Sequence, residues 1–169
     1  MSRVLKNLSS ISVGDVATTD YPGGTGWTGT KIGTIDSNGV TIAEGEPMVE
    51  NLGVAGQIVP IDVNVTPGDS INFTGACYVE VGTELTTIHG GTMGADGWEA
   101  NKEIYVPNKS FVLATKDANM KILIPNGILT GWFTGKLTDT GSALINFKIS
   151  PVDPGTTLSY FKITKKPAA

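Results

Sequence analysis

The segment IDVNVTPGDSINFTGAC, residues 61–77, decides the fold class. Apolar and polar residues alternate over positions 61–65, and the alternation returns at Ile71, Phe73, Gly75 and Cys77. A period of two is typical of a β-strand with one buried face. The Pro-Gly pair between the two runs is a turn signal. The pattern therefore predicts a hairpin whose inward side chains belong to a core.

A second hairpin is predicted in TKIGTIDSNGVTIAE, residues 30–44. Isoleucines and a valine flank the tetrapeptide DSNG at 36–39, and Asn-Gly readily supplies the two positive φ angles of a type I′ turn. Similar apolar patterns follow, with turn signals between most of them. These further predicted strands cover residues 104–107, 110–115, 120–125, 127–137, 142–150 and 158–164.

One short helix interrupts the strand pattern at residues 80–91. Val81, Leu85 and Ile88 fall at i, i+4 and i+7, and Gly90-Gly91 provides a helix stop. About nine strands and one helix in 169 residues, with 22 glycines and 9 prolines for tight turns, predict one all-β domain. We expect a β-sandwich or small barrel, preceded by a flexible N-terminal arm and glycine-rich loop at residues 1–29.

Charge is unevenly distributed along the chain. The formal net charge is -4, so no global basic field favours nucleic acid or an anionic membrane. Residues 36–99 contain ten acids and no lysine or arginine, whereas residues 104–169 hold three acids and eight bases. Two interpretations stay open. The charged segments are simply solvated, or the molecule has an acidic and a basic side suited to head-to-tail association.

Catalytic and cofactor motifs are weak. GTGWTG at 24–29 has dinucleotide-binding spacing, but a strand pattern follows it where that motif needs a helix. His89 is the sole histidine, and Cys77, the sole cysteine, falls in an apolar strand, where we expect a buried thiol. We therefore expect no enzyme activity, cofactor or metal. No signal-peptide pattern opens the chain, so synthesis in a cytoplasm is expected.

Four quoted stretches carry a family resemblance: TIDSNGVTIAEGEP, VPIDVNVTPGDSINFTGACYVE, the helix ending in HGG, and MKILIPNGILTGWFTGKLTDTGSALINFKISPVDP. The order of these stretches and their residue types resemble those of the major tail tube proteins of tailed bacteriophages and related injection systems. The resemblance spans nearly the whole chain. It implies a β-sandwich subunit with a flanking helix, six of which close a ring around a β-barrel wall, with rings stacking into a tube for DNA.

The resemblance also implies partners and sites. Partners would be copies of this chain and other tail proteins in a virion tail, with DNA as non-specific cargo and no membrane. Because each neutralised phosphate adds affinity, a DNA channel should avoid cationic groups, so the base-free segment is the expected lumen wall. The expected lumen acids are Asp36, Glu44, Asp62 and Asp69. The expected subunit or ring contacts are Trp27, Met48, Leu52, Val54, Ile58 and Trp98.

Two other function classes compete. A carbohydrate- or calcium-dependent binding module would use Trp27 or Trp98 as a platform. Its calcium ligands, or the paired carboxylates of a glycosidase, would come from Glu44, Glu46 and Glu50. An enzyme on a jelly-roll scaffold is the third class, and the single histidine makes it the least favoured.

Overall fold

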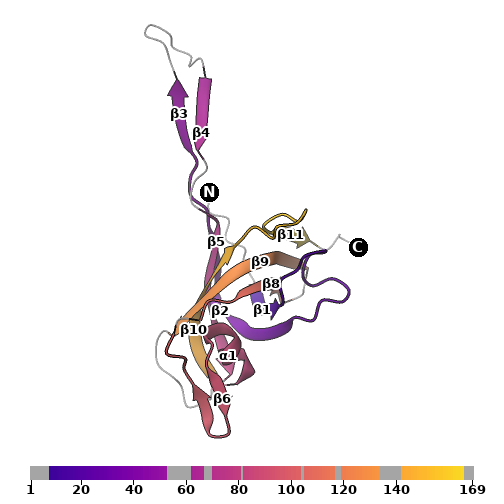
Figure 1. The fold of residues 1–169 in the computed structure, drawn as a ribbon, viewed down its shortest axis with the longest axis vertical. Coiled ribbons are helices and arrows are strands. Elements are labelled where there is room, and N and C mark those ends of the chain that lie inside the picture. The colour runs from indigo at the N-terminus through magenta and orange to yellow at the C-terminus, as the bar shows by residue number, and fades with distance from the viewer. Residues whose placement is uncertain are drawn as a thin grey trace.

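The computed structural model describes residues 8–52, 62–66, 70–80, 82–103, 105–116, 119–133 and 142–165. This part of the chain folds into eleven strands and one helix (Figure 1). The strands are β1 (Leu8–Gly14), β2 (Thr30–Ala43), β3 (Met48–Leu52), β4 (Asp62–Thr66), β5 (Asn72–Glu80), β6 (Thr92–Gly94), β7 (Gly97–Glu99), β8 (Asn108–Thr115), β9 (Met120–Phe133), β10 (Ser142–Pro151) and β11 (Lys162–Lys165). The helix is α1 (Thr83–His89).

Six of these strands close into a barrel. Their order is β10-β5-β2-β1-β8-β9, and β9 pairs back with β10, with every neighbouring pair antiparallel. Closure removes the free edges that an open sheet of this size would leave. The prediction of an all-β small barrel or sandwich with one short helix is confirmed.

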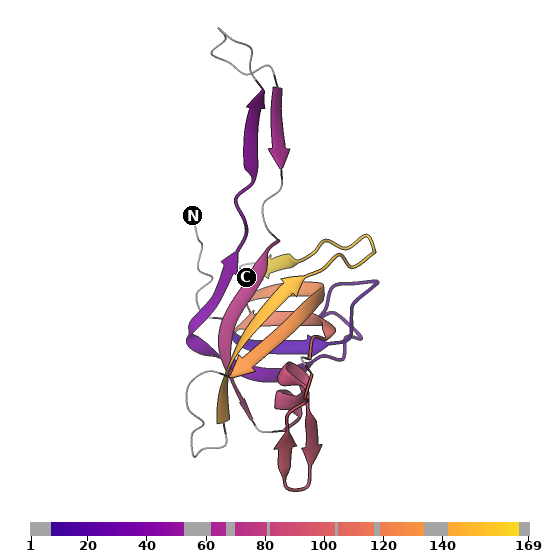
Figure 2. The ribbon, with the colours of Figure 1, turned by 60° about the vertical axis from the view of Figure 1, so that its left-hand side comes forward.

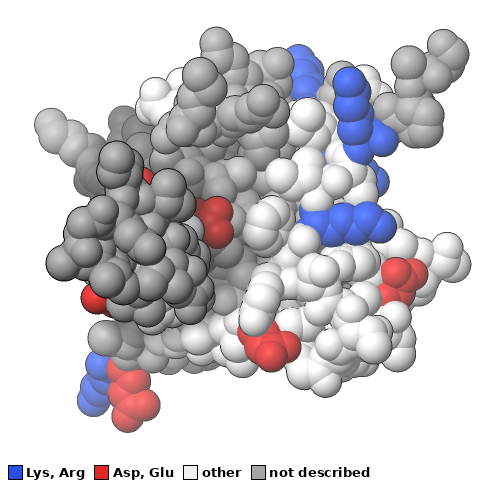
Figure 3. All heavy atoms as spheres, turned by 90° about the horizontal axis from the view of Figure 1, so that it is seen from above, with Lys and Arg blue, Asp and Glu red and all other residues white. Residues whose placement is uncertain are grey.

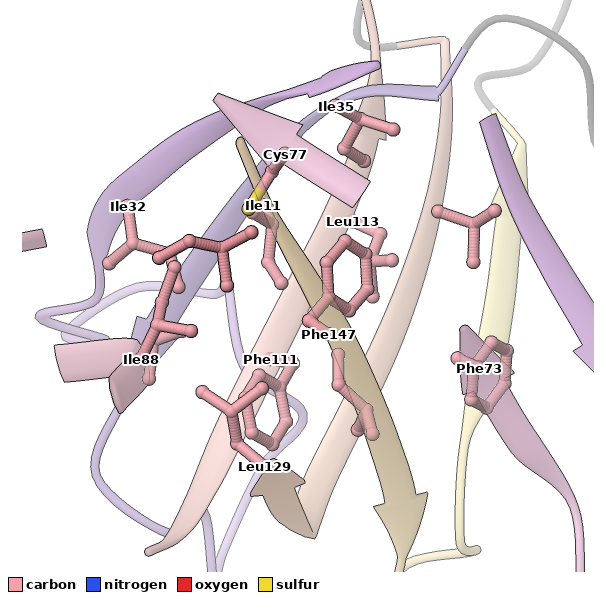
Figure 4. Packing of buried hydrophobic residues seen from close by; sticks show 14 of the residues in the cluster. Ile11, Ile32, Ile35, Phe73, Cys77, Ile88, Phe111, Leu113, Leu129 and Phe147 are labelled. Carbon is pink, nitrogen blue, oxygen red and sulfur yellow. The ribbon is translucent and has the colours of Figure 1, made fainter. Parts of the chain in front are cut away.

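Apolar side chains from all six barrel strands fill the interior (Figure 4). Phe73, Phe111 and Phe147 are fully buried and come from three different strands. Cys77 is buried among them, as the apolar pattern predicts, and burial raises the pKa of its thiol to about 12. The inward faces read from the alternation in the barrel strands therefore form one core, whereas the alternating segment 62–66 is β4, in a separate sheet outside the barrel.

The predicted helix is confirmed as α1. Leu85 and Ile88 are buried, and the helix packs on β2, β5 and β9. Gly90 ends the helix at a φ of 77°, with its N–H donating to the carbonyl oxygen of Thr86 at 2.9 Å. Val81, the third residue of the predicted apolar stripe, lies outside the described residues.

The predicted hairpin at residues 30–44 is wrong. β2 is one strand along its whole length, because Ile35 pairs with Cys77 and Val40 pairs with Gly75 on the same neighbour, β5. Residues 36–39 form a bulge between these pairs, and Gly39 in it has a φ of 73°. A positive φ serves a bulge as well as a turn, so the Asn-Gly signal does not distinguish the two.

The predicted pairing within residues 61–77 is also wrong. β4 pairs with β3, at Met48 with Thr66 and Val49 with Val65, whereas β5 pairs with β2 and β10. The chain leaves the barrel along β2 and β3 and returns along β4 and β5. Alternation predicts which residues share a face of a strand and does not identify the partner strand.

Smaller differences concern the second half of the chain. Residues 105–107 of the predicted strand 104–107 are not in a strand, and β11 begins at Lys162, four residues after the predicted start. Residues 120–125 and 127–137 are predicted as separate strands, but β9 runs from Met120 to Phe133. It continues through Pro125 because the register with β8 shifts there, so no ladder bond is lost to the missing N–H. β6 and β7 form a hairpin over residues 92–99, between the helix and β8, where no strand is predicted.

Candidate self-association surface

A two-stranded arm, defined as residues 44–52 and 62–66, projects from the barrel (Figure 2). β3 and β4 form a sheet of their own with no third strand in the described part of the chain. Each strand therefore has one backbone edge without a partner there. A two-stranded hairpin is marginally stable in water, and open edges are templates for pairing with another chain.

The arm exposes apolar side chains near its base. Met48 is 74% exposed and Val49 is 60% exposed, the two highest values among the large apolar residues that the structure describes. Leu52 lies in β3, but its side chain is outside the described set, as are residues Val54 and Ile58 altogether. Of the predicted apolar contacts on this segment, Met48 is thus the one shown to be available to a partner.

The arm is acidic. Glu44, Glu46 and Glu50 are exposed, Asp62 stands in β4, and the described arm contains no lysine or arginine. Among the described residues, no three His, Cys, Asp or Glu side chains come together in a way that could hold a metal ion. The three glutamates predicted as possible calcium ligands are spread along an extended segment.

Asp36, the first of the three described lumen candidates, lies apart from the arm, in the β2 bulge. Its carboxylate accepts hydrogen bonds from Asn38 Nδ2 at 2.7 Å and from the Tyr78 hydroxyl at 3.3 Å. The hydrogen bond from the Ser37 backbone N–H is the largest of several that lower the pKa of Asp36. The structure does not bring the predicted acids into one cluster, and Asp69 lies outside the described residues.

Trp27 is half-buried, unlike the exposed loop tryptophan that the sequence favours. Its Nε1–H donates to Ser110 Oγ at 2.9 Å, and that hydroxyl donates to the carbonyl oxygen of Asp15 at 2.6 Å. The indole lies against the backbone of Gly14 and Gly29, where a Cβ would collide with the ring. This side chain pins the glycine-rich loop to β1 and β8, and its N–H is already used.

Trp98 is also half-buried, in the β6–β7 hairpin. Its Nε1–H donates to the carbonyl oxygen of Gly90 at 2.8 Å, directly after α1. His89 and Phe133 meet it edge to face, with ring centroids 5.6 and 5.9 Å from the indole. Both tryptophans considered as binding platforms therefore make contacts within the chain, and the indole N–H of each already has an acceptor.

Part of the base-rich region predicted at residues 104–169 forms a basic patch around β11. We define it as Lys116, Lys121, Lys162 and Lys165. Lys121 pairs with a residue of β11, and Lys116 and Lys165 line one groove of about 960 Å³ at the barrel mouth. In the view from above, most of the visible lysine side chains lie on the side of the molecule opposite the arm (Figure 3). The sequence FKITKK carries the signal of a lysine-rich edge strand.

The chain was also compared with known proteins. No protein-family model matches it, and no curated protein matches its sequence. No helix in the described part of the chain has the length and apolar character needed to cross a bilayer. The arm, the charges and the exposed side chains are therefore the features of this chain that bear on its function.

Proposed function

We propose that this chain is a structural, non-enzymatic subunit that assembles with copies of itself. The rings it forms, six-membered by the family resemblance, stack into a phage-type tail tube that DNA passes through. The observation that carries the proposal is the arm. A ribbon with two open edges and exposed Met48 and Val49 gains most of its stability from a partner outside its own barrel.

The charges support the same proposal. An acidic arm without a base would repel the phosphates of DNA and would not arrest its passage. The basic patch lies on a different part of the surface, which suits a contact between unlike faces of two copies. Such heterologous contacts close into rings or continue into filaments.

The test is assembly of the purified protein. Light scattering over a concentration series and negative-stain electron microscopy should show rings or tubes. A matched variant, the arm-shortened chain, has residues 46–69 replaced by Asn-Gly and keeps the paired Ala43 and Asn72. It should stay monomeric at concentrations where the wild-type chain assembles.

Two results would contradict the proposal. One is a wild-type protein that stays monomeric at millimolar concentration, and the other is assembly that is unchanged when the arm is shortened. Monomers whose melting temperature rises with calcium or with oligosaccharides would instead favour the binding module. Turnover of a substrate would favour the enzyme class.

A further inference from the structure

β11 is an edge strand. It pairs with β9, at Lys162 with Leu123 and Ile163 with Ile122, and no described strand pairs with its other side. Ile163 is 47% exposed. Among the described strands, the closed barrel leaves open edges on β11, on the two arm strands and on the short β6–β7 hairpin. These edges are where another chain can add by strand pairing.

The charges select which edges can pair. Lysines on β11 would oppose one another if two β11 edges met, and the glutamates of two arms would repel in the same way. An acidic arm against the basic patch is the favourable combination. Like-charge juxtaposition excludes the wrong partner and opposite charge favours the right one.

The patch is partly held in place before any partner arrives. The Lys162 ammonium group lies 5.1 Å from the centre of the Tyr21 ring. The Tyr21 hydroxyl in turn accepts a hydrogen bond from the Ser159 backbone N–H at 3.0 Å. This bond joins the segment before β11 to the loop between β1 and β2. Asp36 lines the same groove as Lys116 and Lys165, and its carboxylate already accepts hydrogen bonds from Asn38 and Tyr78.

We propose that the β11 edge is the docking site for the arm of a second copy of this chain. An open edge of that arm extends the β9–β11 sheet, which brings Glu46 and Glu50 of one copy beside the lysine-rich β11 strand of the next. Met48 and Val49 are exposed and point to opposite faces of β3, so the one on the same face as Ile163 then covers it. The inference rests on the proposed self-assembly and names the surface that would receive the arm.

Charge reversal tests this contact. K162E/K165E and, separately, E46K/E50K should each raise the protein concentration needed for assembly at least tenfold, which corresponds to about 1.4 kcal/mol. Combining the four substitutions should restore assembly. The matched control K31E/K102E changes the net charge as much as K162E/K165E does, at exposed lysines outside the patch, and should assemble like the wild type.

The outcomes separate this contact from the proposed function. If the wild type assembles and K162E/K165E assembles equally well, the β11 contact is wrong and self-assembly stands. If the wild type never assembles, both fall. Far-ultraviolet circular dichroism and thermal unfolding of each variant show whether it is folded. A K162E/K165E protein that is folded, fails to assemble and is not rescued by E46K/E50K also overturns the contact.

Cross-linking gives an independent measurement. Cys77 is buried, so cysteines introduced on the surface are the reactive thiols. M48C, V49C or E50C is mixed with I163C under mild oxidation, and a mixed disulfide dimer is expected for at least one pairing. Disulfides form when the Cα atoms come within about 7 Å. Absence of a mixed dimer from all three pairings would overturn the proposed contact.

Discussion

Shortening the arm should leave the barrel as stable as before, or slightly more stable. The described arm side chains from Glu46 to Glu50 are all exposed, and none belongs to the core cluster. Replacing residues 46–69 by Asn-Gly keeps Ile71, which packs against the core. The substitution therefore removes a projection and leaves the described barrel contacts in place.

The size of the effect follows from chain entropy. Ala43 and Asn72 are direct partners in the β2–β5 ladder, so the arm is a loop of 28 residues, 44–71, between paired positions. The shortened loop has six residues. For a flexible loop the closure term (3/2)RT ln(28/6) is about 1.4 kcal/mol. Pairing within the arm offsets part of this, so the free energy of unfolding should rise by between zero and about 1.4 kcal/mol.

Urea unfolding followed by tryptophan fluorescence measures this change. Trp27, Trp98 and Trp132 all lie outside the deleted segment, so the probe is the same in both proteins. The measurement is made at a concentration where both are monomeric, because association would add to apparent stability. Destabilisation by more than about 2 kcal/mol would show that the arm supports the barrel and would refute the reasoning.

Three further outcomes are expected. Ile88→Ala should lower the free energy of unfolding by about 2–5 kcal/mol in urea unfolding, because the Ile88 side chain of α1 is fully buried, whereas exposed Thr83→Ala should cost far less. Trp27→Phe should cost about 1 kcal/mol by removing the donor to Ser110, and an unchanged midpoint would contradict this. Burial raises the pKa of Cys77 from 9.0 to about 12, so the unfolded state loses its thiol proton first and stability should fall as pH rises above about 9. Native protein at pH 9 should resist thiol reagents that label it in urea, and equal labelling rates would contradict the buried thiol.

Local patterns predicted the class of fold and most of its elements. Alternation around Phe73 and Cys77 identified inward faces, and the spacing of Leu85 and Ile88 identified the helix, because both depend on the period of the backbone. The partners of the strands could not be read in this way. The positive φ at Gly39 fits both a hairpin turn and a bulge, and only pairing with β5 on both sides of it decides between them.

The candidate site was predicted in part. Its acidic, base-free character and Met48 follow from the sequence, because composition and a polar surrounding are local properties. The half-burial of Trp27 depends on Ser110, which is 83 residues away and is brought there by the β1–β8 pairing. The edge position of Lys162 likewise results from the order of strands around the barrel, which no local pattern contains.

The indole of Trp27 has a consequence for how this chain can vary. Its ring occupies the space where side chains at Gly14 and Gly29 would begin; a Cβ at Gly14 would lie 2.6 Å from Nε1. Two glycines are thus tied to one tryptophan by steric exclusion. In a set of homologous sequences these three positions should change together: larger residues at 14 and 29 are expected only in chains that have lost the ring at 27.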